Sequence, residues 1–165
     1  MKKILLILLV SLIILSSCST TEKAYSFVSS DGIRVFLRRV KLKGEVPVTL
    51  DMTIPTEKSK IIGDATLNYS IITKRGTIKD IESICLVFSI DDGSFETENN
   101  ELLFVEGKRK DEIEIRLTST LSLSSTLSLM ESNRVEVTLK ADSFTYSLDS
   151  TSFISSLDNT KSYLL

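Results

Sequence analysis

Apolar and polar residues alternate with a period of two along most of the chain after residue 24. Residues 48–54 and 65–71 show the alternation most plainly. Such a pattern predicts β-strands with one buried face and one polar face. Shorter stretches of the same alternation occur at residues 25–27, 33–37, 113–117, 135–139 and 144–148. The chain is therefore predicted to be mainly β.

Turn-forming residues separate these segments. Asp31-Gly32 predicts a tight hairpin, because these residues adopt the positive φ angles of such turns. Residues 107–110 are expected to join a strand at residues 102–105 to one at residues 112–117, and residues 141–143 to join a further hairpin. Pro55 is expected to end the strand before it, because proline cannot donate to a ladder. A one-residue shift of the apolar phase predicts a β-bulge at Arg38-Arg39.

Three segments depart from simple alternation. Residues 84–90 are apolar on both faces, which is typical of a central strand. Residues 121–130 fit either a broken strand stripe or a helical face, and we favour a short helix ending near Asn133. The C-terminal tail, residues 151–165, is expected to form one short helix around residues 153–157.

The predicted fold class is all-β: an immunoglobulin-like antiparallel β-sandwich with an extra N-terminal hairpin and one or two short helices near the C-terminus. About seven strands are expected between residues 48 and 148, the number in an immunoglobulin-like sandwich. The paired cysteines and core tryptophan of true immunoglobulin domains are absent from the sequence. Residues 24–150 are expected to form one domain, which suits their length.

The first residues have the order of a secretory signal. Lys2 and Lys3 precede an apolar run at residues 4–15, and Ser16 and Ser17 follow it. The apolar run is shorter than the roughly 20 residues of a spanning helix, so a permanent transmembrane helix is the weaker alternative.

The tetrad at residues 15–18, Leu-Ser-Ser-Cys, resembles the lipobox of bacterial lipoproteins. The resemblance is confined to residues 1–18. It implies that a peptidase removes residues 1–17 by cutting between Ser17 and Cys18, and that Cys18 carries a covalent diacylglycerol. Residues 18–23 would then be a short polar tether. The alternative is that Cys18 is an unlipidated cysteine close to the cleavage site of a general secretory signal. The implied location is the cell membrane or the outer membrane, with the domain outside the cytoplasm.

Charge and cysteine content narrow the choice of partners. Losing Lys2 and Lys3 from the 20 basic residues leaves 18 against 22 acidic residues, a net charge of −4. Nucleic acid is therefore an unsuitable partner, because its phosphates require a basic face. Once Cys18 carries lipid, Cys85 has no partner for an internal disulfide. Its apolar neighbours predict a buried thiol.

The sequence contains no histidine, which excludes Ser-His-Asp and Cys-His catalysis. It also lacks the glycine-rich phosphate loop and the nucleophile elbow. We therefore expect no enzymatic activity and no cofactor other than the covalent lipid.

Two groups of charged residues are candidate sites. Asp91, Asp92 and Glu96 carry oxygen ligands of the kind that calcium binds, although their spacing differs from an EF-hand loop. Together with Glu98 they are also the candidates for a carboxylate-based hydrolase. The alternative interpretation, without a functional role, is a solvated turn between strands.

A second group, formed by basic residues, could bind an anion. These are Arg34, Arg38, Arg39 and Lys41, with Lys43 close by. The alternative interpretation is the solvated face of an edge strand, where charge prevents unwanted sheet pairing.

The expected function is that of a membrane-anchored binding or assembly module of the cell envelope. It would act through loops or a sheet edge on an envelope protein, since edge-strand addition needs no special side chains. Two alternatives stay open. One is a surface-exposed adhesin or antigen, and the other is a calcium-dependent or carboxylate-based hydrolase with its site at residues 91–98.

Replacing Cys18 with Ala tests the anchor. We expect the variant to incorporate no fatty-acid label in a bacterial host, because the thiol that forms the thioether is gone. Two acyl chains hold a protein stably at a membrane, whereas one binds only marginally. A label still incorporated into Cys18→Ala would refute lipidation at this residue.

Overall fold

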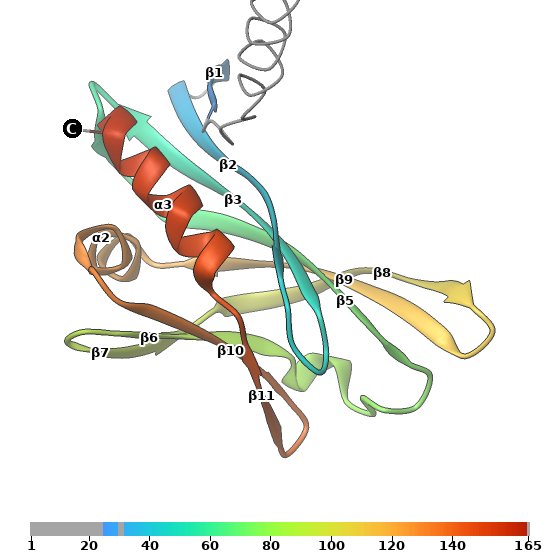
Figure 1. Cartoon of the computed structure of the whole chain (residues 1–165). Coiled ribbons are helices and arrows are strands. Elements are labelled where there is room, and N and C mark those ends of the chain that lie inside the picture. The colour runs from blue at the N-terminus through green and yellow to red at the C-terminus, as the bar shows by residue number, and fades with distance from the viewer. Residues whose placement is uncertain (1–24, 30–31, 165) are drawn as a thin grey trace, which may run out of the picture.

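The computed structural model describes residues 25–29 and 32–164 (Figure 1). The signal peptide, Cys18 and the tether predicted for residues 1–23 lie outside the described residues. Within the described part, the strands form two antiparallel sheets, which confirms the predicted all-β sandwich. No helix there is both long enough and apolar enough to span a membrane.

In the described part of the chain, seven strands build the larger sheet, in the order β1-β2-β3-β5-β9-β8 with β4 beside β3. Their bounds are β1 (Tyr25–Ser29), β2 (Gly32–Leu42), β3 (Val48–Glu57), β4 (Lys60–Ile61), β5 (Ala65–Lys74), β8 (Glu98–Arg109) and β9 (Glu112–Leu121). The smaller sheet has the order β11-β10-β6-β7. Its strands are β6 (Cys85–Ile90), β7 (Gly93–Glu96), β10 (Val135–Ala141) and β11 (Phe144–Leu148).

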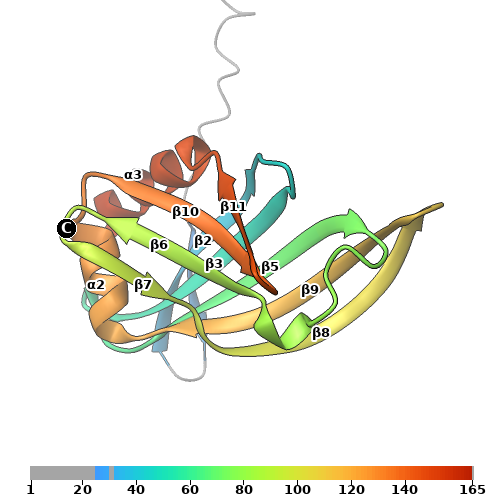
Figure 2. The same ribbon diagram turned by 90° about the horizontal axis from the view of Figure 1, so that it is seen from below.

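The core lies between the larger sheet on one side and the smaller sheet with two helices on the other. The helices are α2 (Leu123–Glu131) and α3 (Thr151–Leu164). Phe153 of α3 contacts Phe88 of β6, with ring centroids 5.7 Å apart, and both side chains are fully buried. The helix and the smaller sheet therefore share the inner face of the larger sheet (Figures 1 and 2).

Residues 121–130 are mostly helical, as favoured from the sequence. Ser122 is the N-cap of α2, and its Oγ accepts a hydrogen bond from the Ser125 N–H at 3.2 Å. Asp64 adds a second cap by accepting from the Leu123 N–H at 2.8 Å. These bonds satisfy N–H groups that the first turn of a helix leaves unpaired, and Leu129 is buried.

The C-terminal helix is longer than the sequence indicated. α3 extends over 14 residues rather than about five. Phe153 and Leu157 lie on its buried side together with Thr160, whose hydroxyl donates to the Ser156 carbonyl oxygen at 2.8 Å. The segment predicted as a tail is thus part of the core.

Several local predictions are confirmed. The register of β2 and β3 shifts between Leu37 and Val40, which places the bulge at Arg38-Arg39. The β8–β9 and β10–β11 hairpins also form. The turn of the first lies at Lys110-Asp111 rather than at residues 107–110, because β8 continues to Arg109. Ser29 pairs with Gly32, so β1 and β2 also form a hairpin, although residues 30–31 of its turn lie outside the described residues.

The prediction that Pro55 ends its strand is wrong, because β3 continues to Glu57. On one side of β3, pairing with β5 ends at Thr53 and pairing with β4 begins at Thr56. Pro55 lies in the gap between them, where the missing N–H is not needed. Between Val48 and Leu148 the chain forms nine strands, β3 to β11, instead of about seven.

A close backbone approach joins the two sheets at one corner. Lys43, just after β2, forms a bridge with Asp149, whose N–H donates to the Lys43 carbonyl oxygen at 2.7 Å. A Cβ atom at Gly44 would lie 2.8 Å from the Ser147 carbonyl oxygen. This corner therefore requires glycine for lack of space.

Gly44→Ala should destabilise the protein by about 1–3 kcal/mol, the usual range for overpacking, because a backbone oxygen must move. Gly107→Ala is the matched control, since a Cβ there has no neighbouring heavy atom within 4 Å. Urea unfolding followed by circular dichroism measures both variants. Equal urea midpoints for Gly44→Ala and Gly107→Ala would show that the corner accommodates the added methyl group without loss of stability.

Candidate functional site

The edge strand β8 is the most unusual surface in the described part of the chain. It is the last strand of the larger sheet, so its outer edge has no neighbouring strand there (Figure 2). Of its twelve residues, eleven are exposed and Asn100 is half-buried. We call this strand, Glu98–Arg109, the β8 edge.

Four consecutive apolar side chains lie in the middle of the β8 edge. The exposed fractions are 49% for Leu102, 51% for Leu103, 41% for Phe104 and 46% for Val105. Exposed edge strands present unpaired N–H and C=O groups, and proteins usually avoid combining them with exposed apolar side chains. Exposed apolar side chains gathered on one strand in this way are typical of an interaction surface.

Two side chains of the apolar run, Leu102 and Val105, are exposed because the smaller sheet does not reach them. Leu102 pairs with Leu117 and Val105 with Ile115, so these side chains lie on the inner face of the larger sheet. In Figure 2 the β8–β9 hairpin projects past the smaller sheet. The inner face therefore continues beyond the core into solvent.

A hydrogen-bonded corner fixes the start of β8. The Thr97 N–H donates to the Leu86 carbonyl oxygen at 2.9 Å, and the Leu86 N–H donates to Thr97 Oγ1 at 3.1 Å. Thr97 Oγ1 donates to Asn100 Oδ1 at 2.9 Å, and the Tyr69 hydroxyl donates to the same oxygen at 3.2 Å. Burial holds the pKa of Tyr69 far above its ordinary value, so it remains a donor.

The β8 edge is regular only in its middle. Its register against β9 shifts between Glu98 and Glu101, between Leu102 and Phe104, and between Gly107 and Arg109. Bulges such as these restrict where another strand can pair. Residues 104–107 remain regular, and the alternate backbone groups of this stretch point away from β9.

Ionic contacts on the outer face hold β8 and β9 together. Lys108 Nζ lies 2.6 Å from Glu114 Oε2, and this hydrogen-bonded pair raises the pKa of Lys108 and lowers that of Glu114. Further along β9, Arg116 donates to Asp51 Oδ2 at 2.9 Å and to Ser70 Oγ at 3.0 Å. Apart from Phe104, which lies opposite Arg116, this part of the outer face is therefore polar and internally paired.

A pocket of about 580 Å³ adjoins the β8 edge on its inner side. It is lined by residues 79–82, which include part of the 3₁₀ turn η1 (Ile81–Ser83), together with Asn100, Leu102 and Leu117. The β8 edge thus combines unpaired backbone groups with a hollow that can receive a side chain.

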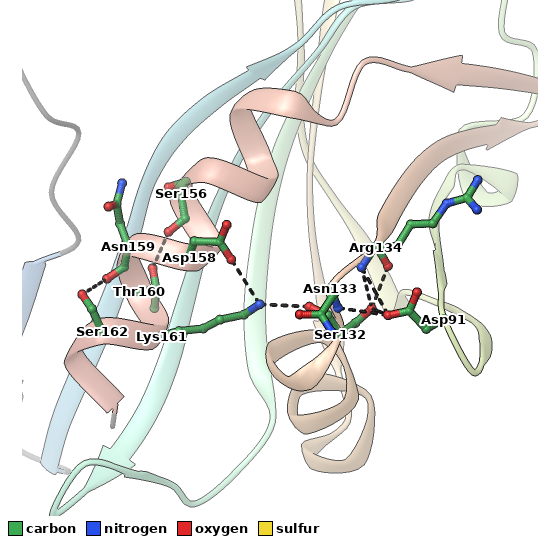
Figure 3. Close-up of polar contacts among 10 residues, drawn as sticks. All are labelled: Asp91, Ser132, Asn133, Arg134, Ser156, Asp158, Asn159, Thr160, Lys161 and Ser162. Carbon is green, nitrogen blue, oxygen red and sulfur yellow. Dashed lines mark hydrogen bonds and ion pairs between the residues drawn. The ribbon is translucent and has the colours of Figure 1, made fainter.

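The acidic residues singled out from the sequence do not converge. Asp91 accepts hydrogen bonds from the Asn133 N–H at 3.0 Å and the Ser132 hydroxyl at 3.1 Å (Figure 3). These bonds hold the pKa of the Asp91 carboxyl below its usual range. Asp92 is exposed in the turn, and Glu96 lies at the far end of β7, about 10 Å along the strand.

Glu96 and Glu98 have separate surroundings. Glu96 forms an ion pair with Lys140 and accepts a contact from Cys85 Sγ at 3.6 Å, and the bond from Lys140 lowers the pKa of Glu96. Glu98 begins β8. Among the described residues, no group of three or more histidine, cysteine, aspartate or glutamate residues is arranged to hold a metal ion.

The basic residues on β2 are spread along the strand. Arg34 pairs in register with Pro55, and Lys41 pairs with Thr49, so the two lie about 23 Å apart. Arg38 and Arg39 occupy the bulge between them, and both are exposed. β1 pairs with β2 only from Gly32 to Phe36, so Arg34 lies between two strands. In the described part of the chain, Arg38, Arg39 and Lys41 have β3 on one side and no strand on the other, which agrees with the alternative interpretation of an edge strand.

A second pocket of about 580 Å³ opens between α2, α3 and β4. Ile61, Leu127, Met130 and Leu164 form its apolar lining. Lys161 on its rim donates to the Ser132 carbonyl oxygen at 2.9 Å and lies 3.2 Å from Asp158 Oδ1 (Figure 3). This lysine thereby ties α3 to the end of α2.

Sequence reasoning identified residues 102–105 as a strand but missed their exposure. Four apolar residues in a row usually indicate a strand buried on both faces. The available signal was the charge on either side of the run, because charged residues commonly flank apolar strands that meet solvent. Comparisons with protein-family models, curated proteins and solved structures found no match for this chain.

Cys85 is buried, as predicted, and should react slowly. Burial, followed by the negative charge of Glu96, raises the pKa of its thiol to about 11. Because the thiolate is the nucleophile, alkylation by iodoacetamide at pH 8 should be about 100-fold slower in the folded protein than in urea. Mass spectrometry of the Cys85 peptide measures both rates.

The variant Glu96→Gln should speed this reaction, since it removes a charge that opposes the thiolate. Glu98→Gln is the matched control, two residues further along the chain. Equal folded-state rates for the two variants would contradict the role given to Glu96.

Proposed function

We propose that this chain is a lipid-anchored protein of the bacterial cell envelope that binds another polypeptide through the β8 edge and catalyses no reaction. The lipobox resemblance at residues 15–18 supports the anchor. The observation that carries the binding role is the combination of an unpaired strand edge with four exposed apolar side chains, Leu102 to Val105.

Edge-strand addition fits this surface. Main-chain hydrogen bonds from an added strand provide affinity, while pockets beside the edge provide specificity. On the β8 edge, the regular stretch at residues 104–107 is available for main-chain hydrogen bonds. The hollow lined by Leu102 and Leu117 is available to receive a side chain of the partner. The charged residues on both sides of the apolar run limit the length of a strand that pairs there.

Leu103→Lys tests the binding role of the β8 edge. A lysine in place of this apolar side chain removes contact area and places a charge where the partner would pack. Val28→Lys is the matched control, because Val28 is 82% exposed on β1, the strand at the opposite edge of the same sheet. Both variants are made in the full-length chain and studied in bacterial membranes dissolved in mild detergent.

We expect the wild type and Val28→Lys to migrate as an assembly on native gels, and Leu103→Lys to migrate mainly as the monomer. A change of roughly tenfold or more in affinity is typical for an apolar residue in the centre of an interface. Thermal unfolding confirms that both variants are folded. An assembly that Leu103→Lys leaves intact would overturn the proposed role of the β8 edge.

A further inference from the structure

The two ends of the β8 edge carry charges of opposite sign. Glu98 and Glu101 precede the apolar run, whereas Glu106, Lys108 and Arg109 follow it and together carry a net positive charge. A strand with one acidic end and one basic end is complementary to a copy of itself that runs in the opposite direction. The same surface patch on both partners is what a two-fold symmetric dimer uses.

The register against β9 decides which residues could meet. Glu101, Phe104, Glu106 and Arg109 all lie on the outer face of the larger sheet, whereas Val105 lies on the inner face. Residues directly opposite each other in a sheet must lie on the same face. A two-fold axis at Val105 satisfies this condition, since it places Glu101 opposite Arg109 and Phe104 opposite Glu106.

Neighbouring positions of the axis lose the ionic complementarity. With the axis at Phe104, Glu101 would lie opposite Gly107, which is on the other face. With the axis at Glu106, this carboxylate would face its own copy, and Glu101 would face Asp111. Like charges directly opposite each other destabilise a strand pair.

The charges that the Val105 register brings together are free to pair. In the described part of the chain, neither Glu101 nor Arg109 forms an ion pair, whereas Lys108 is held by Glu114 at 2.6 Å. The regular stretch of β8 at residues 104–107 also contains Val105. The axis therefore passes through the part of the edge where backbone pairing is undisturbed.

We infer that the β8 edge pairs antiparallel with the β8 edge of a second copy of this chain, about a two-fold axis at Val105. The larger sheets of the two copies then form one continuous sheet, closed by two Glu101–Arg109 ion pairs. This inference rests on the proposed function and names the partner of the same edge. Two copies anchored in one membrane would meet at a raised effective concentration, which favours pairing along a short edge.

Cysteine crosslinking of the full-length chain in bacterial membranes tests the axis. Residues opposite each other in an antiparallel pair have Cβ atoms about 4.5–5.5 Å apart, close to the spacing of a disulfide. On oxidation with copper phenanthroline, Val105→Cys should give a disulfide-linked band at twice the monomer mass. The unsubstituted chain, which retains Cys18 and Cys85, gives the background.

Glu98→Cys is the matched control on the same strand. In the proposed dimer its two copies would be about 45 Å apart, so we expect at least tenfold less of the linked band than for Val105→Cys. Equal yields for the two positions would mean random collision and would overturn the inference.

A charge swap tests the register. In the Val105→Cys chain, Glu101→Arg or Arg109→Glu alone should lower the yield of linked dimer about threefold to tenfold, since each places like charges opposite each other at two symmetric positions. The double variant Glu101→Arg with Arg109→Glu should restore it. If the double variant does not recover the yield of linked dimer, the proposed pairing register is overturned.

The two proposals fail differently. If Leu103→Lys disrupts the native assembly but Val105→Cys gives no linked dimer, the β8 edge binds a different chain and only self-pairing is overturned. If Leu103→Lys leaves the assembly intact, the binding role of the edge is overturned as well.

Discussion

The difference in width between the two sheets determines how this protein folds and which part of the larger sheet stays uncovered. In the described part of the chain, four strands face seven, so the smaller sheet cannot cover the inner face of the larger one. At the β2–β3 side, α3 fills the uncovered area, with Phe153 in contact with Phe88. At the β8–β9 side neither α2 nor α3 does so, and the β8–β9 hairpin projects past the smaller sheet (Figure 2). The inner-face side chains of Leu102 and Val105 therefore stay about half exposed.

The corner at Thr97 makes this arrangement possible. The chain leaves the edge of the smaller sheet at Glu96 and enters the edge of the larger sheet at Glu98. Paired hydrogen bonds with Leu86 and the hydrogen bond from the buried Tyr69 to Asn100 fix the crossing. Because β8 begins there, it becomes an outer strand of the larger sheet. The same bonds hold it in place without a second neighbouring strand.

Local features of this fold were predictable from the sequence, whereas long-range pairings were not. The phase shift after Leu37 located the bulge, and alternation located most strands. The exposure of residues 102–105 depends on the width of a sheet that forms from distant segments, which the alternation of apolar and polar residues does not encode. Asp91 is similar, because its carboxylate binds backbone N–H groups more than forty residues away. The structure was therefore needed to show that Asp91 serves this local contact.

The proposed role of the β8 edge sets two opposing requirements: the edge must be open to a partner strand, and it must not pair with every strand that it meets. A long, flat, apolar edge would pair with any available strand, so proteins interrupt such edges with bulges and charge. Here the bulges confine regular pairing to residues 104–107. The flanking charges favour a partner strand that places opposite charges beside them. An edge restricted in this way provides little affinity in dilute solution. The proposed lipid anchor compensates for this, because it concentrates the domains at one surface and allows a short, selective contact to form.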